Sequence, residues 1–252
     1  MSEKQYWWDL ILPELLQLIQ EPWGNPLVGI NRRQEVATPF AMRAFRRTLA
    51  VDALLKAGYY WESHALIRNG YEDWLQLSYL FRELGDTRCN DYKTHIHKHD
   101  ARVYDAFRTI CGQDAANRFF GEIPTKVSQY VGLPRSRTKS ASFALLADDV
   151  GLRNVHDFVY TYLSGRSHPT GRIRELFDTS KSIAVARIPS RNPSDETRLA
   201  LWLGWFTARI IVLAAREFGI DRESFCDEHL LPFVASGINL ETCVLIREYS
   251  TQ

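Results

Sequence analysis

Several short motifs that identify enzyme classes are absent from the sequence. It contains no glycine-rich phosphate loop, no dinucleotide-binding fingerprint and no GxSxG nucleophile elbow. Its four cysteines form no CxxC pair and no other metal-site spacing, which is typical of reduced cysteines in a cytosolic protein. These absences argue against the common phosphate-cradling and triad enzymes, and we predict no cofactor and no metal.

Long apolar runs are also absent. The longest, residues 199–215, contains Thr207 and Arg209 and is short for a membrane span. The first ten residues lack the basic and then apolar pattern of a signal peptide. We therefore expect a cytoplasmic protein that has no membrane partner.

A strong overall charge is missing too, because 31 Lys and Arg are balanced by 30 Asp and Glu, a net charge of +1. This balance excludes a general attraction to nucleic acid or to an anionic membrane. The charge is nevertheless uneven. Residues 121–191 hold 11 Lys or Arg and 6 Asp or Glu, a net of +5 that leaves −4 for the remainder. This segment supports the hypothesis of an anionic partner.

What the sequence does contain is a long helical stretch from Lys56 to Leu84, with no proline and two glycines, Gly58 and Gly70. Apolar residues occur on every side of it, and a helix that is apolar all round is normally buried. Residues 195–218 have the same character. We predict an all-α fold, a single bundle-like domain over residues 1–252 with two buried apolar helices at about 59–84 and 195–218.

The remaining segments complete the predicted bundle. Thr38 and Pro39 have the pattern of an N-cap followed by proline at the first helical position, so we expect a helix from Pro39 to about Ala57. Residues 182–188 alternate weakly and predict an extended segment or a small hairpin. Further helices are predicted at residues 5–20, 88–111, 113–130 with a break at Pro124, 142–150, 153–165 and 222–235, together with a basic loop at 132–142.

Three histidines cluster in the segment THIHKHD. On a helix, His95, His99 and Asp91 share one face, a spacing that can chelate a divalent metal. No second element offers a further ligand, so we interpret the cluster as part of a polar helix surface.

Arg68 and Glu72 lie four residues apart inside the predicted central helix and therefore on one face of it. Ionisable groups on a buried helix must be paired, because an unpaired buried charge costs several kcal/mol. Two interpretations stand: an internal ion pair that fixes the helix register, or one side of a polar pocket.

A second polar line occurs in YTYLSGRSHPTG, where Tyr160, Ser164 and His168 fall at i, i+4 and i+8. Pro169 biases His168 away from helical geometry, so the line is expected to hold for the first two residues. If this helix packs on the central one, His168 can meet Arg68 and Glu72. A His beside a Glu and a hydroxyl group is suited to acid–base chemistry or to phosphate positioning.

Two short motifs within residues 49–170 carry a resemblance to a known family. They read Leu-x-Arg-x-x-x-Glu around Arg68 and Glu72, and Tyr-x-x-Leu-Ser-x-x-x-His-Pro from Tyr160 to Pro169. Together they resemble a family of bacterial all-helical proteins that is described only as a domain of unknown function. The resemblance implies a helical fold, and Arg68, Glu72, Ser164 and His168 match the family's characteristic positions.

A looser resemblance is to HEPN domains, helical bundles whose ribonuclease members act as toxins and antiviral defence effectors. Those enzymes carry an Arg, four to six further residues and a His on one helix, usually completed across a homodimer. Here Arg153 and His156 are too close together, as are Arg166 and His168. The resemblance implies an RNA-directed effector and a homodimer, and the departure from the motif argues against that cleavage mechanism.

Two hypotheses of function remain open. In the first, the protein is an enzyme or effector that acts on RNA or a nucleotide, with His168 as general acid–base, Arg68 as phosphate binder, Glu72 as orienting group and Ser164 as hydrogen-bond donor. In the second, it is a non-enzymatic interaction or sensor protein in which the same residues form a structural network. The predicted nucleic-acid-binding residues are Arg135, Arg137, Lys139 and Arg166.

Overall fold

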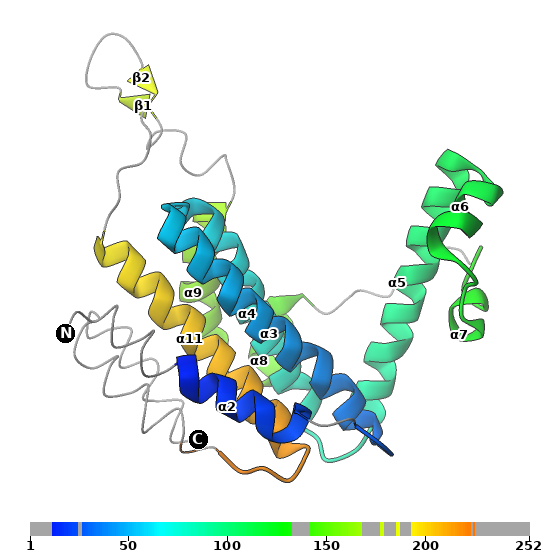
Figure 1. Cartoon of the computed structure of the whole chain (residues 1–252), viewed down its shortest axis with the longest axis horizontal. Helices are drawn as coiled ribbons and strands as arrows, with labels where there is room; N and C mark the ends of the chain where they lie inside the picture. Colours follow the sequence, from blue (N-terminus) through cyan, green and yellow to red (C-terminus); the bar gives the residue numbers. More distant parts are fainter. Residues whose placement is uncertain are drawn as a thin grey trace. The chain divides into compact units, whose positions relative to one another are not determined.

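The computed structural model describes residues 12–24, 27–132, 142–167, 177–178, 185–186, 193–222 and 224, and all that follows concerns these residues. Nine helices and one pair of two-residue strands lie within them (Figure 1), which confirms the predicted all-α fold. None of the described helices is long and apolar enough to cross a lipid bilayer. In chain order the elements are α2 (Leu12–Trp23), α3 (Arg32–Ala57), α4 (Tyr60–Phe81), α5 (Thr87–Cys111), α6 (Gln113–Phe120), α7 (Thr125–Ser128), α8 (Phe143–Asp149), α9 (Arg153–Ser167), β1 (Phe177–Asp178), β2 (Val185–Ala186) and α11 (Pro193–Arg216).

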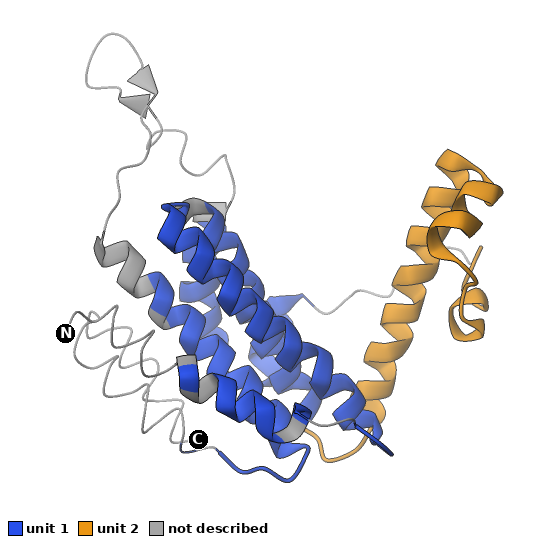
Figure 2. Cartoon of the chain, in the orientation of Figure 1, with its two compact units in different colours: residues 1–82, 141–252 blue, residues 83–140 orange. Residues whose placement is uncertain are grey.

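The chain divides into two compact units (Figure 2). Unit 1 comprises residues 1–82 and 141–252, and unit 2 comprises residues 83–140. The prediction of a single domain over the whole chain stays a prediction.

Unit 1 is built on α3, α4 and α11, which pack against one another, while α9 packs on α4 and α2 packs on α11. The ribbons of α3, α4 and α11 run side by side in Figure 1. The two apolar helices predicted to be buried are α4 and α11, and most of their described apolar side chains are buried. At their contact the ring of Phe206 stacks on Trp74 at 5.8 Å and meets Tyr71 edge-on at 5.5 Å. These aromatic side chains, together with the aliphatic residues around them, form the core.

The start of α3 differs from the sequence-based prediction. The helix begins at Arg32, seven residues before Pro39, because Asn31 and Gln34 form a capping box. The Asn31 side chain accepts from the Gln34 amide at 2.9 Å, and the Gln34 side chain accepts from the Asn31 amide at 2.9 Å. This reciprocal pair satisfies two orphan donors of the first turn, and Pro39 is accommodated inside the helix. Thr38 is not the cap: its hydroxyl donates to the Gln34 carbonyl and accepts from Trp23 Nε1 of α2.

A left-handed glycine separates α3 from α4. Gly58 has φ 85°, and its amide donates to the carbonyl oxygens of Leu54 and Leu55 at the end of α3. Because this conformation favours glycine over other residues, it fixes the position of the turn. The central helix begins at Tyr60 and ends at Phe81, close to the predicted bounds of about 59–84.

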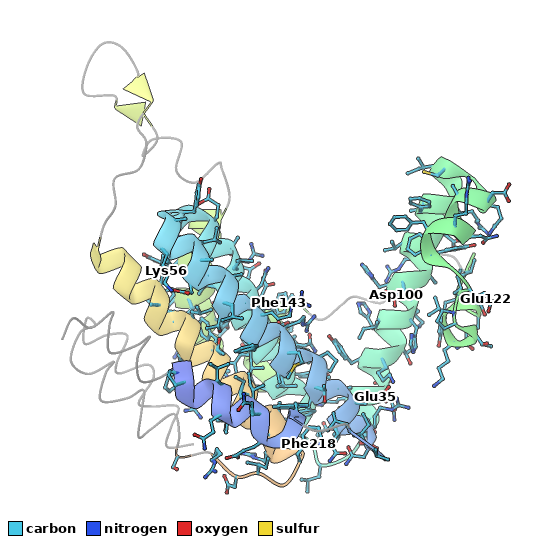
Figure 3. The ribbon with its side chains drawn as sticks, viewed as in Figure 1. Glu35, Lys56, Asp100, Glu122, Phe143 and Phe218 are labelled. Carbon is cyan, nitrogen blue, oxygen red and sulfur yellow. The ribbon has the colours of Figure 1, made fainter. Side chains whose placement is uncertain are left out.

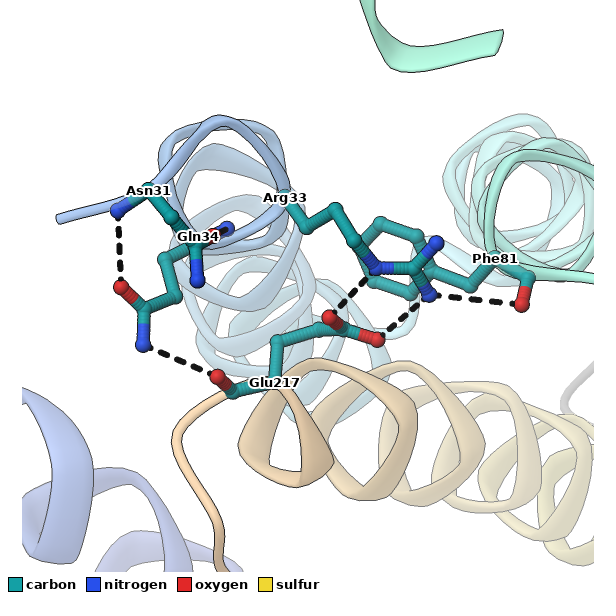
Figure 4. A network of polar contacts seen from close by, with 5 residues as sticks. All are labelled: Asn31, Arg33, Gln34, Phe81 and Glu217. Carbon is teal, nitrogen blue, oxygen red and sulfur yellow. Dashed lines mark hydrogen bonds and ion pairs between the residues drawn. The ribbon is translucent and has the colours of Figure 1, made fainter. Parts of the chain in front are cut away.

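A largely buried ion pair joins the ends of three helices (Figure 4). Arg33 of α3 donates through Nε and Nη2 to the two carboxylate oxygens of Glu217, at 2.6 and 2.8 Å, just beyond the end of α11. The same guanidinium donates to the carbonyl of Phe81 at 3.4 Å, at the end of α4. Gln34 donates to the backbone carbonyl of Glu217 at 2.9 Å. These contacts fix the relative positions of α3, α4 and α11 at one end of the unit.

Unit 2 consists of α5, α6 and α7. Tyr104 of α5 donates to Asn117 of α6 at 3.1 Å and accepts from Gln113 at 2.5 Å. The predicted helix 113–130 is interrupted before Pro124, and α7 follows that proline. Of the apolar residues by which the predicted helix 88–111 was expected to touch the core, Tyr104 is buried, whereas Ile96 and Val103 are exposed. These two lie outside the contact that α6 makes with Tyr104 and Phe107 of α5.

The other predicted elements are found with small shifts. Helices α8 and α9 correspond to the predictions 142–150 and 153–165, and the Ser142 hydroxyl caps α8 by accepting from the Leu145 amide. Val185–Ala186, inside the predicted extended segment, pairs antiparallel with Phe177–Asp178. Helix α2 ends at Trp23, and residues 5–11 of the predicted helix 5–20 lie outside the described residues. Most of the basic loop 132–142 also lies outside them. Of the predicted helix 222–235, only its first residue and Ser224 are described.

Candidate functional site

Helices α4 and α9 pack together with polar side chains along their contact. Arg68 contacts Tyr160, and Tyr71, farther along α4, contacts His156, earlier on α9. The order of these contacts shows that the two helices run antiparallel. We refer to this group of side chains as the polar seam, and it comprises Arg68, Tyr71, Glu72, His156, Tyr160 and Ser164.

Arg68 is at the centre of the polar seam. Its Nε donates to Glu72 Oε1 at 2.8 Å, one turn along α4. Its Nη2 donates to the hydroxyl of Tyr160 at 2.9 Å, and its guanidinium carbon lies 4.8 Å from the centroid of that ring. The side chains of Arg68 and Glu72 keep 21% and 17% of their surface exposed. The ion pair predicted from the sequence is therefore formed, half-buried, and extended by Tyr160.

His156 connects the polar seam to the core. Its ring stacks on that of Tyr160 with the centroids 4.7 Å apart, and its Nδ1 is hydrogen-bonded to the hydroxyl of Tyr71 at 3.0 Å. Burial lowers the pKa of His156 below its ordinary value, because the charged imidazolium is disfavoured away from water. The nearby charge of Arg153 also lowers this pKa, and Asp157 and Asp148 oppose the shift. The surroundings of the ring therefore favour its neutral form over the imidazolium.

Ser164 follows Tyr160 by one turn and lies on the same side of α9. Its hydroxyl oxygen is buried and has no hydrogen-bond partner among the described residues. A buried hydroxyl without a partner carries a desolvation cost of about 1–3 kcal/mol. It is thus a polar group available to a ligand or to a part of the chain outside the described ranges.

The structure brings together some of the predicted site residues and leaves others undescribed. Arg68 and Glu72 are paired, and Ser164 lies on the line that starts at His156 and passes through Tyr160. Arg166 falls on α9, but its side chain is not described. His168, Arg135, Arg137 and Lys139 lie outside the described residues.

Two members of the polar seam were not predicted from the sequence. His156 lies four residues before Tyr160, so the line Tyr160–Ser164 extends backward to it by the same spacing that first suggested the line. Tyr71 was interpreted only as an apolar residue of α4, although its hydroxyl can form a hydrogen bond. Arg153, which lies too close to His156 for the HEPN spacing, is exposed and donates to Asp157 at 3.0 Å and to Asp148 at 3.0 Å.

A metal site is not formed by the described residues. In those ranges no three His, Cys, Asp or Glu side chains are grouped closely enough to hold a metal ion.

Comparisons with known proteins give one match. A family model described as a family of unknown function (DUF5677) matches residues 34–182, a range that includes α4, α9 and the whole polar seam. No curated protein and no solved structure matches the chain.

Proposed function

The chain belongs to the family of unknown function DUF5677. From the geometry of its side chains, we propose that the polar seam between α4 and α9 is the site of an effector or enzyme acting on RNA or a nucleotide. Both motifs of the seam fall inside the matched range, so the proposal concerns the segment by which the family is defined.

The observation that carries this proposal is the way in which the guanidinium of Arg68 is held. Its guanidinium is oriented from two sides, by the Glu72 carboxylate and by the Tyr160 hydroxyl, yet about a fifth of the side chain remains exposed. A planar guanidinium suits the geometry of a phosphate, and one that is already held in place loses little conformational freedom on binding.

The other residues take roles that follow from their chemistry and position. Glu72 orients Arg68, and Ser164 supplies a hydrogen bond from its buried hydroxyl. His168, which follows the last residue of α9, acts as the general acid–base. Arg135, Arg137, Lys139 and Arg166 bind the phosphate backbone, in the segment with a net charge of +5. His156 is assigned no chemical step, because its ring is buried and its Nδ1 is hydrogen-bonded to the hydroxyl of Tyr71.

In biological terms this is a cytoplasmic effector of HEPN-like type, acting in antiviral defence or as a toxin. The support is the all-helical fold and the polar helix pair, not a shared Arg–His motif.

RNA binding tests the proposal directly. Labelled mixed-sequence RNA is titrated at low salt with the wild-type chain, with Arg68→Ala, with Arg68→Lys, and with the triple variant Arg135→Glu, Arg137→Glu and Lys139→Glu. We expect binding that weakens in all three variants and has a smaller salt dependence in the triple variant. Arg68→Lys keeps the positive charge and loses the planar guanidinium, so it separates the contribution of the charge to RNA binding from that of the guanidinium geometry. Absence of binding by the wild-type chain at low salt would refute the nucleic-acid role.

A second candidate function is favoured by the internal bonding of the seam. Glu72, Arg68 and Tyr160 are joined by hydrogen bonds, and Tyr160 stacks on His156, so most of the polar groups satisfy one another. In this alternative the seam is a structural network that sets the register of α4 against α9, and the protein is a non-enzymatic interaction or sensor protein. The two candidates differ in what His168→Ala does: loss of RNA binding, cleavage or toxicity with little change in stability supports the first, and lowered stability with unchanged activity supports the second.

A further inference from the structure

The carboxylate of Glu72 uses only one of its two oxygens within the described part of the chain. Arg68 Nε donates to Oε1 at 2.8 Å, whereas Arg68 Nη2 donates to the hydroxyl of Tyr160 instead of to Oε2. None of the described residues donates to Oε2, and the side chain of Glu72 is 17% exposed. The polar seam therefore contains a carboxylate oxygen that is available as a hydrogen-bond acceptor.

Two other carboxylates that are buried to a similar degree use both oxygens. Glu217, with a side chain 12% exposed, accepts from Arg33 Nη2 through Oε1 and from Arg33 Nε through Oε2, as the dashed lines in Figure 4 show. Asp73, with a side chain 16% exposed, accepts from Arg43 through Oδ1 and from Arg47 through Oδ2. Both of these ion pairs join different elements of unit 1 and leave no carboxylate oxygen over. The single bond of Glu72 is thus not a general property of half-buried ion pairs in this chain.

Asp52 of α3 also accepts from a side chain through one oxygen, but its other oxygen is closed to a ligand. Its Oδ2 accepts from Lys56, which is labelled in Figure 3, at 2.7 Å. Its Oδ1 is buried and accepts from none of the described residues. Glu72 Oε2 is not one of the buried side-chain atoms that lack a partner. The free oxygen of Glu72 is therefore in contact with solvent, where a ligand can reach it.

Two hydroxyl groups complete the set of polar groups around Arg68. Ser164 Oγ is buried and is bonded to none of the described residues. The Tyr160 oxygen accepts from Arg68, and the hydrogen of this hydroxyl is donated to none of the described residues. A hydroxyl group can donate to a phosphate oxygen, whereas an ionised carboxylate only accepts. The polar seam thus offers a guanidinium and two hydroxyl groups to an anion, and one carboxylate oxygen to a hydroxyl group beside that anion.

We propose that Glu72 is the residue by which the polar seam distinguishes RNA from DNA, an inference that rests on the proposed function. Each ribose of an RNA chain carries a 2′-hydroxyl group next to its 3′-phosphate, and DNA lacks this group. With the phosphate bound by Arg68 and Ser164, the 2′-hydroxyl donates to Glu72 Oε2. The same carboxylate repels the phosphate, and a ligand without the 2′-hydroxyl does not offset this repulsion. Glu72 thereby favours RNA and disfavours DNA.

Binding of matched single strands tests the role of Glu72. Labelled RNA of mixed sequence, DNA of the same sequence and 2′-O-methyl RNA of that sequence are each titrated with the full chain at low salt. We expect the wild type to bind RNA about tenfold more tightly than either of the other strands, as for one hydrogen bond to a charged group. The methylated strand keeps the ribose and loses the 2′ donor, so it separates the hydrogen bond from the shape of the strand.

Glu72→Gln is the decisive variant, because its amide oxygen still accepts from Arg68 and its amide nitrogen donates where Oε2 accepted. We expect its preference for RNA to disappear. Glu62→Gln makes the same charge change at an exposed position in the first turn of α4 and should keep the tenfold preference about as in the wild type. Ser164→Ala should weaken the binding of RNA and DNA alike, because this hydroxyl contacts the phosphate. Circular dichroism checks that each variant retains its helices.

The ratio of the two affinities separates the possible outcomes. A purely structural role of Glu72 lowers the affinities for RNA and DNA together, so a preference for RNA that Glu72→Gln retains overturns the inference. Equal binding of RNA and DNA by the wild type also overturns it and leaves the proposed function standing. So does equal binding of RNA and 2′-O-methyl RNA by the wild type, a comparison that needs no variant. Binding of none of the three strands refutes the proposed function itself, and this inference with it.

Discussion

The guanidinium of Arg68 lies against the ring of Tyr160, 4.8 Å from its centroid, and donates a hydrogen bond to the hydroxyl of that same residue. One arginine is thereby held both by the face and by the polar tip of one tyrosine. Glu72 holds it from the other side. This relationship joins the two sequence motifs of the polar seam, which lie about ninety residues apart.

Removing the carboxylate of Glu72 tests how much of this arrangement is structural. We expect Glu72→Ala to lower the free energy of unfolding by roughly 1–3 kcal/mol, because Arg68 loses its ion pair in a site that water reaches only in part. Urea denaturation measures the change. Asp157→Ala, which removes the i, i+4 partner of Arg153 from a pair whose side chains are both about half exposed, is the control and should cost less than about 1 kcal/mol. Equal changes in the free energy of unfolding for the two variants would show that the Arg68–Glu72 pair stabilises the fold no more than the control pair does.

Acid should destabilise the protein through His156. The folded state holds the pKa of this histidine below its ordinary value of 6.5, so the unfolded chain takes up a proton at higher pH than the folded one. The stabilisation is complete above pH 6.5 and is lost as the pH falls below it. We expect His156→Gln to have a smaller drop in melting temperature between pH 7.5 and pH 5.5 than the wild type. Parallel curves for the two proteins would contradict the assignment.

The ion pair between Arg33 and Glu217 should be among the most sensitive contacts in unit 1. We expect Glu217→Gln to cost about 3–5 kcal/mol, because it leaves Arg33 largely buried beside a neutral partner. The exposed pair Arg32–Glu35 provides a matched control, and Glu35→Gln should cost less than about 1 kcal/mol. Chemical denaturation compares the two. Similar midpoints would mean that water screens the buried pair as fully as the exposed one.

The aromatic core should dominate stability. We expect Trp74→Ala and Trp205→Ala each to cost about 3–5 kcal/mol, because both side chains are buried and leave cavities. Leu84→Ala, at a residue that is almost fully exposed, is the control and should change little. Thermal melts followed by circular dichroism give the comparison, and an unchanged melt for either tryptophan variant would contradict the described burial.

The sequence predicted those features that depend on local spacing. Arg68 and Glu72 are paired because an i, i+4 spacing on a helix is sufficient to bring them together. The break near Pro124 and the capping Ser142 were likewise local. The contact between Arg68 and Tyr160 depends instead on which helices pack together and in which direction, and periodicity does not encode that.

Errors arose where two local signals competed. Thr38 and Pro39 form a good helix start, but the capping box of Asn31 and Gln34 satisfies more backbone donors and lies upstream, so it determines the start of α3. Val103 is an apolar residue of α5 that is exposed, because α6 packs over the neighbouring Tyr104 and Phe107 and leaves Val103 outside that contact. An apolar position in the sequence does not show which element covers it.

Arg33 and Glu217 are in contact although they lie 184 residues apart in the sequence. Arg33 is therefore synthesised early and Glu217 late. Helices α3 and α4 leave the ribosome well before α11, on which both of them pack. Until α11 has been synthesised, the apolar side chains that it covers in the folded protein, including Trp74 and Tyr71, are not covered by it. Nascent chains that expose apolar surface are the usual substrates of chaperones. A ribosome-bound chain arrested before Pro193 should therefore be cleaved in α3 and α4 by a low dose of protease, whereas the released full-length chain should resist.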